Sequence, residues 1–206
     1  MSGIFITFEG GDGSGKTTQA EFLTAWLREG GNTVVSSREP GGTEVGNEIR
    51  QLVLHRRGAI ASRAEALLYA ADRAQNVATI VRPALLRGEI VVQDRYFDSS
   101  VAYQGAGRAL DATEIRELSL WAAEGLVPDL TIVLDLDEAV ARARLDADRD
   151  QYDRLESEES DFHARVRAAF SDVADSEPGR FLVVDATASE SSIATVIRAR
   201  VETLLA

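Results

Sequence analysis

The chain has 206 residues, enough for one domain with a single buried core. It contains 34 Asp and Glu against 22 Lys and Arg, a formal net charge of −12. This charge argues against a general binder of nucleic acid or acidic membranes, because phosphate backbones require a basic surface. Cysteine is absent, which excludes disulfides and thiolate chemistry. With no signal-peptide pattern and no apolar run of membrane-spanning length, we expect a soluble cytoplasmic protein.

The first expected elements are a strand over residues 4–8 and a helix that ends at Gly30 and Gly31. Between them, residues 9–18 fit the phosphate-loop (P-loop) pattern G-x-x-x-x-G-K-[ST]. The glycines let backbone N–H groups point at phosphate oxygens, while the lysine reaches the β- and γ-phosphates and the threonine hydroxyl ligates Mg²⁺. The residues expected to bind ATP here are Gly10, Gly11, Asp12, Gly13, Ser14, Gly15, Lys16, Thr17 and Thr18.

Lysine usage adds a second argument for this loop. Lys16 is the only lysine in a chain that otherwise uses arginine for every basic side chain. Lysine is a compact point charge that fits inside a tight phosphate cradle, whereas arginine is a planar fork. The alternative is that Lys16 is a remnant of compositional drift.

The rest of the chain alternates short apolar strands with helices, which predicts an α/β fold: a five-stranded parallel sheet with helices on both faces. We expect one domain over residues 1–206, with a charged lid of about residues 142–160 inserted into it. The further strands are expected at residues 33–37, 89–94, 130–135 and 181–185, and the further helices at residues 43–54, 62–87 (kinked at Pro83), 161–174 and 193–204.

Several charged residues follow the predicted strands directly. Ligands of parallel sheets bind beyond the carboxyl ends of the strands, where Glu9, Arg38, Asp94 and Asp135 are expected. Asp94 could hold the water shell of Mg²⁺ while Arg95 clamps a transferring phosphoryl group. The alternative is that both residues only cap the end of a strand.

Arginines also gather in the charged stretch, at Arg142, Arg144, Arg149 and Arg154. A segment of this kind could close over ATP and bring an arginine to the transition state. The alternative is a solvated helix face with i,i+4 ion pairs.

Tyr69 and Arg73 lie four positions apart on a predicted helix, so both could reach one planar ligand. Tyr69 as core filler is the competing interpretation. The two histidines have no partner pattern, and we assign them no role.

Four stretches together resemble the bacterial thymidylate kinases: residues 9–18, 38–43, 69–75 and 94–104. The resemblance covers essentially the whole chain, and residues 94–104 carry it with the most specificity. It implies a P-loop kinase fold and transfer of the γ-phosphoryl group of ATP to dTMP, giving dTDP and ADP for dTTP synthesis. It further implies Mg²⁺ as cofactor and a homodimer.

The resemblance also implies a role for individual residues. Arg38 and Arg95 would hold the dTMP phosphate, and Asp12 would meet the 3′-hydroxyl. Tyr69 would stack on the base, Arg73 would hydrogen-bond the thymine with Ser100 and Gln104 nearby, and Tyr103 would crowd the sugar 2′ position. Arg144 would stack on adenine. The implied catalytic residues are Lys16, Arg95 and Arg149, and the implied metal-associated residues are Thr17, Asp94 and Glu9.

Two departures from the family pattern concern the catalytic arginine. Some members carry an arginine where this chain has Gly13, which moves the catalytic arginine of this chain to the lid. The spacing and acidity of the lid leave the choice between Arg149 and Arg154 open.

Two other classes of phosphate-loop protein compete with the kinase of a nucleotide. A GTPase switch requires an Asn-Lys-x-Asp motif, which cannot exist when Lys16 is the only lysine. A kinase for another nucleotide, a nucleoside or a small hydroxyl substrate stays open. With a hydroxyl acceptor it would need a base, and Glu9 is the candidate.

Overall fold

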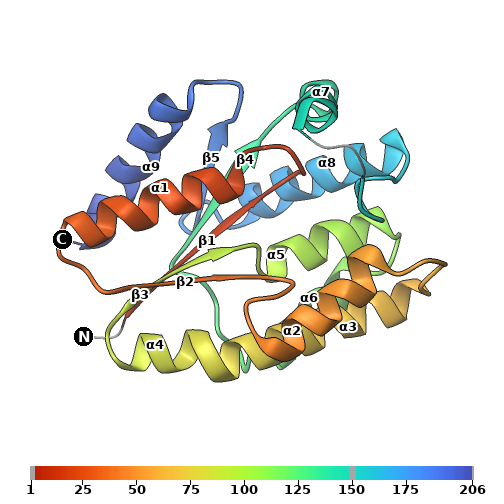
Figure 1. Ribbon diagram of the computed structural model, residues 1–206, viewed down its shortest axis with the longest axis horizontal. Helices are drawn as coiled ribbons and strands as arrows, with labels where there is room; N and C mark the ends of the chain where they lie inside the picture. The colour runs from red at the N-terminus through yellow and green to blue at the C-terminus, as the bar shows by residue number, and fades with distance from the viewer. Residues whose placement is uncertain (1–2, 149–151, 206) are drawn as a thin grey trace.

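The computed structural model describes residues 3–148 and 152–205. Its centre is a five-stranded parallel sheet in the order β2-β3-β1-β4-β5 (Figure 1). Because β1 is the middle strand, the loop that follows it opens at the centre of the sheet's carboxyl edge. The strands are β1 (Ile4–Gly10), β2 (Val34–Arg38), β3 (Ile90–Asp94), β4 (Leu130–Asp135) and β5 (Phe181–Asp185).

The alternation of side chains along β1 assigns them to two cores. Ile6 and Phe8 belong to a cluster with residues of α1 (Lys16–Glu29) and α9 (Glu190–Leu205). Phe5 belongs to a cluster on the opposite face of the sheet. Since successive side chains of a strand point to opposite faces, Glu9 points to the same face as Phe5.

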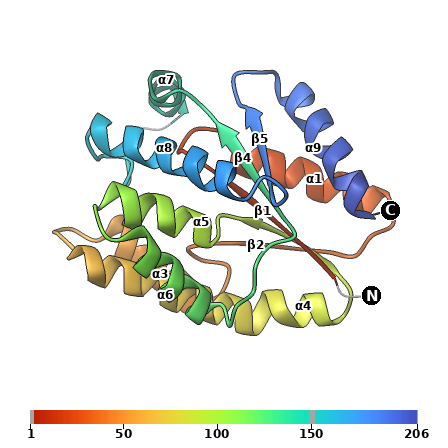
Figure 2. The same cartoon turned by 180° about the vertical axis from the view of Figure 1, so that it is seen from behind.

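Helices other than α1 and α9 cover the second face of the sheet, to which Phe5 points (Figure 2). The predicted three-layer fold, a parallel sheet between two helical layers, is therefore confirmed. The elements outside α1 and α9 are α2 (Glu44–Arg50), α3 (Ser62–Asn76), α4 (Arg82–Leu86), α5 (Phe97–Ser100), α6 (Ala112–Ala122), α7 (Glu138–Asp148) and α8 (Ser160–Ser176).

The structure differs from the sequence prediction in how two helices continue. The predicted helix over residues 62–87 consists of α3, a π-type turn at Val77–Val81 and α4. Pro83 has no N–H and crowds the preceding turn, so a widened turn just before it lets the helical path continue. Similar π-type turns extend α2 over Gln51–His55 and α5 over Val101–Gly107.

The charged stretch that the sequence sets apart as a lid is partly helical. α7 carries Arg142 and Arg144 and begins at Glu138, before the predicted start of the lid. A helix is expected here only as the alternative of a solvated helix face, because Val140 and Leu145 are the only large apolar residues in α7, too few for an amphipathic stripe. Among the described residues, no helix has the length and apolar character needed to cross a membrane.

Candidate active site

A cavity of about 850 Å³ opens at the carboxyl edge of the sheet. The predicted site residues with described positions line it, with the exceptions of Glu9, Gly10, Gly11, Asp135, Arg142 and Arg154. Arg149 lies outside the described residues. The predicted residues that line the cavity are Asp12, Gly13, Ser14, Gly15, Lys16, Thr17, Thr18, Arg38, Tyr69, Arg73, Asp94, Arg95, Ser100, Tyr103, Gln104 and Arg144.

Two glycines give the phosphate loop its shape. Gly15 has φ 89° and caps α1, a left-handed conformation that L side chains rarely adopt. Gly13 has φ 73°, and a Cβ atom built on it would lie 2.9 Å from the carbonyl oxygen of Ala141 in α7. The lid helix thus packs directly on the phosphate loop at a position where any side chain would collide with it.

Lys16 is drawn into this loop. Its Nζ donates to the carbonyl oxygen of Gly11 at 2.6 Å and to the Ser14 hydroxyl at 3.3 Å. Burial and the neighbouring Arg95 lower the pKa of Lys16 to about 8. The lysine therefore stays mainly protonated at neutral pH, which suits it to bind a phosphate.

Thr17 and Asp94 come together from two elements of the fold. The Thr17 hydroxyl at the start of α1 donates to Asp94 Oδ2 at the end of β3, across 2.6 Å. Mg²⁺ in nucleotide kinases is held by few protein oxygens together with waters and substrate phosphates. These two oxygens fit that donor set. Among the residues that the structure describes, no group of three or more acidic or histidine side chains forms a closed metal cage.

Glu9, predicted to be metal-associated, does not line the cavity with this pair. Its side chain is fully buried on the Phe5 face of the sheet, where it accepts hydrogen bonds from Tyr96 N, Ser99 N and Ser99 Oγ. Burial and the nearby Asp98 raise the pKa of Glu9 to about 8. The two carboxylate oxygens of Glu9 are thus engaged by three donors from the segment that follows β3.

Arg95 lies at the centre of the site and has an unusual backbone conformation. Its φ of 66° lies in the left-handed region, which costs a non-glycine residue roughly 1–2 kcal/mol. Its backbone N–H donates to the carbonyl oxygen of Phe8, and its side chain turns back to donate to the carbonyl oxygen of Gly10 at 2.9 Å. The strain is thereby tied to a defined placement of the guanidinium beside the phosphate loop.

The same guanidinium pairs with Asp12 and donates to the Tyr103 hydroxyl. Burial alone would raise the pKa of Asp12, but Arg95 and Lys16 hold it below the ordinary value. Burial raises the pKa of Tyr103 well above the ordinary value, so its hydroxyl keeps its proton. These three side chains form one charged and fully hydrogen-bonded wall of the cavity.

Another part of the cavity wall combines an aromatic ring with arginines. Tyr69 is only 7% exposed and packs with Leu54 and Phe162, so it is both a core residue and part of the cavity wall. Arg73 is buried, pairs with Glu39 across 2.9 Å and donates to Ser100 at 3.1 Å. A rigid arginine beside an aromatic ring suits recognition of a planar polar ligand.

Comparison with known proteins assigns the chain to a family. Residues 8–197 match the family model described as thymidylate kinase. The chain belongs to the thymidylate kinase family. It is 66% identical over 206 residues to the thymidylate kinase of Clavibacter michiganensis subsp. michiganensis, covering 100% of this chain and 98% of that protein. It is 69% identical over 200 residues to that of Leifsonia xyli subsp. xyli, covering 97% and 95%. The crystal structure of thymidylate kinase from Ehrlichia chaffeensis superimposes with a TM-score of 0.77 at 33% identity, over 100% of both chains.

Family membership makes the chain an enzyme, a dTMP kinase that phosphorylates dTMP to dTDP with ATP as donor. The resemblance drawn from the sequence is therefore confirmed, and the comparisons favour no other substrate. The alternative function, phosphorylation of a hydroxyl substrate, also lacks its candidate base, because Glu9 does not line the cavity.

Sequence reasoning missed one basic residue of this thymidylate kinase site. Arg50 in α2 lines the cavity and donates to the carbonyl oxygen of Pro40 at 2.9 Å. Burial and the nearby Arg38 lower the pKa of Arg50. Two nearby guanidinium groups repel each other, and an anion bound between them would relieve this repulsion. Arg50 falls on a predicted helix, and only the proximity of that helix to the loop carrying Arg38 could have singled it out.

The lid arginines of the thymidylate kinase chain have different partners. Arg144 in α7 lines the cavity and donates to the carbonyl oxygen of Ala186 at 2.9 Å. Arg142 instead donates to the carbonyl oxygen of Glu156 and lies over the ring of Tyr152. Arg154 donates to the carbonyl oxygen of Val53, at 2.7 Å, and to the carboxylate of Glu65 in α3.

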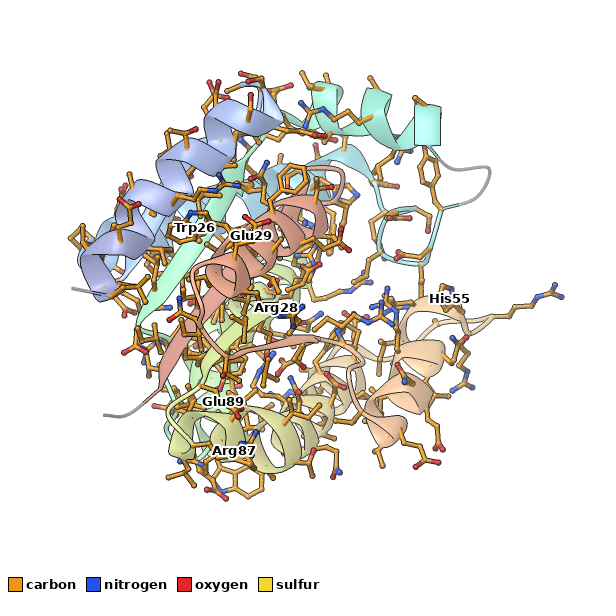
Figure 3. All side chains as sticks on the ribbon, turned by 60° about the vertical axis from the view of Figure 1, so that its left-hand side comes forward. Trp26, Arg28, Glu29, His55, Arg87 and Glu89 are labelled. Carbon is orange, nitrogen blue, oxygen red and sulfur yellow. The ribbon has the colours of Figure 1, made fainter. Side chains whose placement is uncertain are left out.

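Neither histidine lines the large cavity. Figure 3 places His55 beyond the end of α2, at a distance from the surface ion pair of Arg87 and Glu89 at the end of α4. His163 lies on α8, where its ring meets Phe162 edge-on.

Proposed function

We propose that phosphoryl transfer from ATP to dTMP takes place inside the 850 Å³ cavity, with ATP at the phosphate loop and dTMP between Arg38, Tyr69 and Tyr103. One observation carries this assignment: a cationic phosphate loop and an aromatic, arginine-lined pocket open into the same cavity, with Arg95 between them. The acceptor phosphate of dTMP is already an anionic nucleophile, so no base is needed. Catalysis then consists of positioning and of neutralising charge.

On the donor side, the backbone of residues 10–18 would surround the phosphates, and Lys16 would contact the β- and γ-phosphates. Arg95 would face both phosphoryl groups and stabilise the charge that develops between them. Arg149 is our candidate for the lid arginine that joins them during transfer. Arg144, on the outer wall of the cavity, is the candidate to stack on adenine.

On the acceptor side, Arg38 and Arg50 would bind the dTMP phosphate, and Tyr69 would stack on the base. Arg73 and Ser100 would contact polar atoms of the thymine. Asp12 would accept a hydrogen bond from the 3′-hydroxyl. Its carboxylate already accepts one from the hydroxyl of Tyr103 at 2.9 Å. The ring of Tyr103 would then fill the space of a 2′-hydroxyl and favour deoxyribose.

Mg²⁺ is the cofactor that this site suits. Thr17 and Asp94 would hold the ion, because their oxygens already lie 2.6 Å apart beside the phosphate loop. When bound, the ion supplies positive charge to the transferring phosphates. Asp94 would orient its water shell, and Lys16 would complete the cationic surround.

A homodimer in the cytoplasm is the assembly we propose, with residues 142–160 acting as a lid on one domain. α3 and α6 pack against each other, and each presents a large apolar side chain to solvent: Leu67 is 57% exposed and Trp121 is 80% exposed. Exposed apolar residues on adjacent helices are typical of a surface that a second subunit covers. Light scattering of the wild type and of Trp121→Glu tests this, and a monomeric wild type would refute it.

A substrate panel tests the activity itself. ADP release is measured with Mg-ATP and dTMP, dUMP, AMP, CMP or thymidine, and repeated with dTMP after chelation of Mg²⁺ by EDTA. We expect dTMP to give the highest kcat/KM, thymidine to give no turnover, and chelation to abolish activity. A preference for thymidine or AMP over dTMP would contradict the proposal.

A further inference from the structure

A buried carboxylate connects the base end of the cavity to the lid. Glu65 in α3 is fully buried, although acidic side chains are rarely buried without partners. Its Oε1 accepts from Gln104 Nε2 at 2.9 Å, and its Oε2 accepts from Arg154 Nη2. Arg108 adds longer hydrogen bonds of 3.3 Å to both oxygens. No role in the site was assigned to Glu65 from the sequence.

These contacts determine which end of the Gln104 amide can face a ligand. Glu65 forms ion pairs with two guanidinium groups, and the oxygens of a carboxylate only accept hydrogen bonds. A flipped Gln104 amide would put its oxygen against the carboxylate and lose a buried hydrogen bond. Since Gln104 is 1% exposed and also lines the cavity, its carbonyl oxygen is the end left to accept a hydrogen from a ligand.

We propose that Glu65 is a positioning residue for base specificity, acting through Gln104. A fixed acceptor at the cavity wall suits a base that carries a ring N–H. The only such group on thymine or uracil is N3–H, because N1 carries the sugar. Cytosine has an unprotonated N3, which would face the Gln104 oxygen acceptor to acceptor. This inference rests on the proposed placement of dTMP at the Tyr69 end of the cavity.

The test measures kcat/KM for dTMP, dUMP and dCMP in the wild type, Glu65→Gln, Gln104→Ala and the double variant. Glutamine at position 65 can donate as well as accept, so the Gln104 amide is free to turn over. We expect the dUMP-to-dCMP ratio to fall by about 10- to 100-fold in Glu65→Gln. The dTMP-to-dUMP ratio should stay within about twofold, because both bases carry N3–H and a structural defect would weaken them alike.

The double variant shows whether Glu65 acts through Gln104. If it does, adding Glu65→Gln to Gln104→Ala leaves the dUMP-to-dCMP ratio unchanged. Glu158→Gln is the matched control, since it removes the 2.6 Å ion pair of Arg108 with Glu158 but leaves the Gln104 contact in place. It should retain the wild-type ratio.

Thermal melting identifies any variant that does not fold. Should Glu65→Gln fail, Glu65→Asp keeps the charge for both arginines but withdraws the acceptor by one methylene, so the same ratio should fall. An unchanged dUMP-to-dCMP ratio in the folded variant, or an equal fall in the Gln104→Ala background, would overturn the inference. A wild type that does not phosphorylate dTMP would instead refute the proposed function.

Discussion

The hydroxyl of Tyr103 donates a 2.9 Å hydrogen bond to the carboxylate of Asp12, which lies 91 positions earlier in the chain. Arg95 pairs with the same carboxylate and lies over the Tyr103 ring, 5.0 Å from its centroid. The tyrosine ring is therefore fixed against the phosphate loop. A rigid ring at this position gives a steric origin for the choice of sugar.

We predict that Tyr103→Ala raises activity on ribothymidine monophosphate relative to dTMP. Removing the ring frees space for one hydroxyl, so the ratio of kcat/KM values should change by about 10- to 200-fold. Tyr103→Phe is the matched control, because it keeps the ring and loses only the hydrogen bond to Asp12. It should weaken both substrates and leave their ratio unchanged. An unchanged ratio in Tyr103→Ala would place the sugar selection elsewhere.

Lys16→Arg should fold but lose most of its activity. The Nζ atom lies 2.6 Å from the carbonyl oxygen of Gly11, and a planar fork would not match the contacts of this compact charge. A guanidinium would have to leave the loop or spread it apart. Thermal melting and steady-state kinetics with dTMP check both parts of this prediction. Near wild-type turnover with a normal melting temperature would show that the loop accepts either cation.

The sequence predicted the fold and most of the cavity wall because both depend on local patterns. Short apolar strands between amphipathic helices define a parallel sheet, and a phosphate loop after the first strand lies at the carboxyl edge. Asp94 and Arg95 were found because they follow a strand. Tyr69 and Arg73 were found because helical spacing places them on one face.

The parts that sequence missed depend on contacts between distant segments. Glu9 looks like a site residue because it adjoins the phosphate loop, yet strand alternation points it into the core. Arg50 and Glu65 look like ordinary charged helix residues until the tertiary fold brings them to the cavity or to Gln104. α7 was considered only as an alternative, a solvated helix face, because it lacks a long apolar stripe, whereas in the fold it packs against Gly13.

Asp72 gives a prediction about pH and stability. It is fully buried, its Oδ1 accepts from the backbone N–H of Gly41 at 3.0 Å, and its Oδ2 has no partner among the described residues. Burial and the nearby Glu39 raise the pKa of Asp72 from 3.8 to about 7. The folded protein therefore binds a proton that the unfolded chain releases, and its stability falls as pH rises from about 4 through 7.

Asp72→Asn should remove this dependence, because an amide still accepts from Gly41 and does not titrate. Between pH 5 and pH 8 the free energy of unfolding of the variant should gain about 1–3 kcal/mol on the wild type. At about 2–4 °C per kcal/mol this is a shift of several degrees in melting temperature. Glu89→Gln is the surface control: Arg87 lowers the pKa of Glu89, so its contribution changes only at more acidic pH. A constant difference between Asp72→Asn and the wild type would contradict the prediction.

The last prediction concerns the two lid arginines. Arg154 is occupied: its Nε donates to the carbonyl oxygen of Val53 at 2.7 Å, and its Nη2 pairs with the buried Glu65. The local sequence suggests Asp153 and Glu156 as its partners, whereas the structure pairs it with Glu65 of α3. Arg154→Ala should therefore lower the melting temperature, by the equivalent of about 1–3 kcal/mol, because it strips a buried carboxylate of one partner. Its effect on kcat should be smaller.

Arg149→Ala should show the opposite balance. Gly13 leaves the phosphate loop without an arginine, so the charge that spreads over the transferring oxygens needs a guanidinium from the lid. A contact made mainly in the transition state lowers kcat far more than it raises KM. We expect a loss in kcat of roughly 10³-fold under saturating dTMP, the low end for such arginines, with a melting temperature close to wild type. If Arg154→Ala proves the more damaging to kcat, or if Arg149→Ala raises only the KM for ATP, then the catalytic arginine is not Arg149.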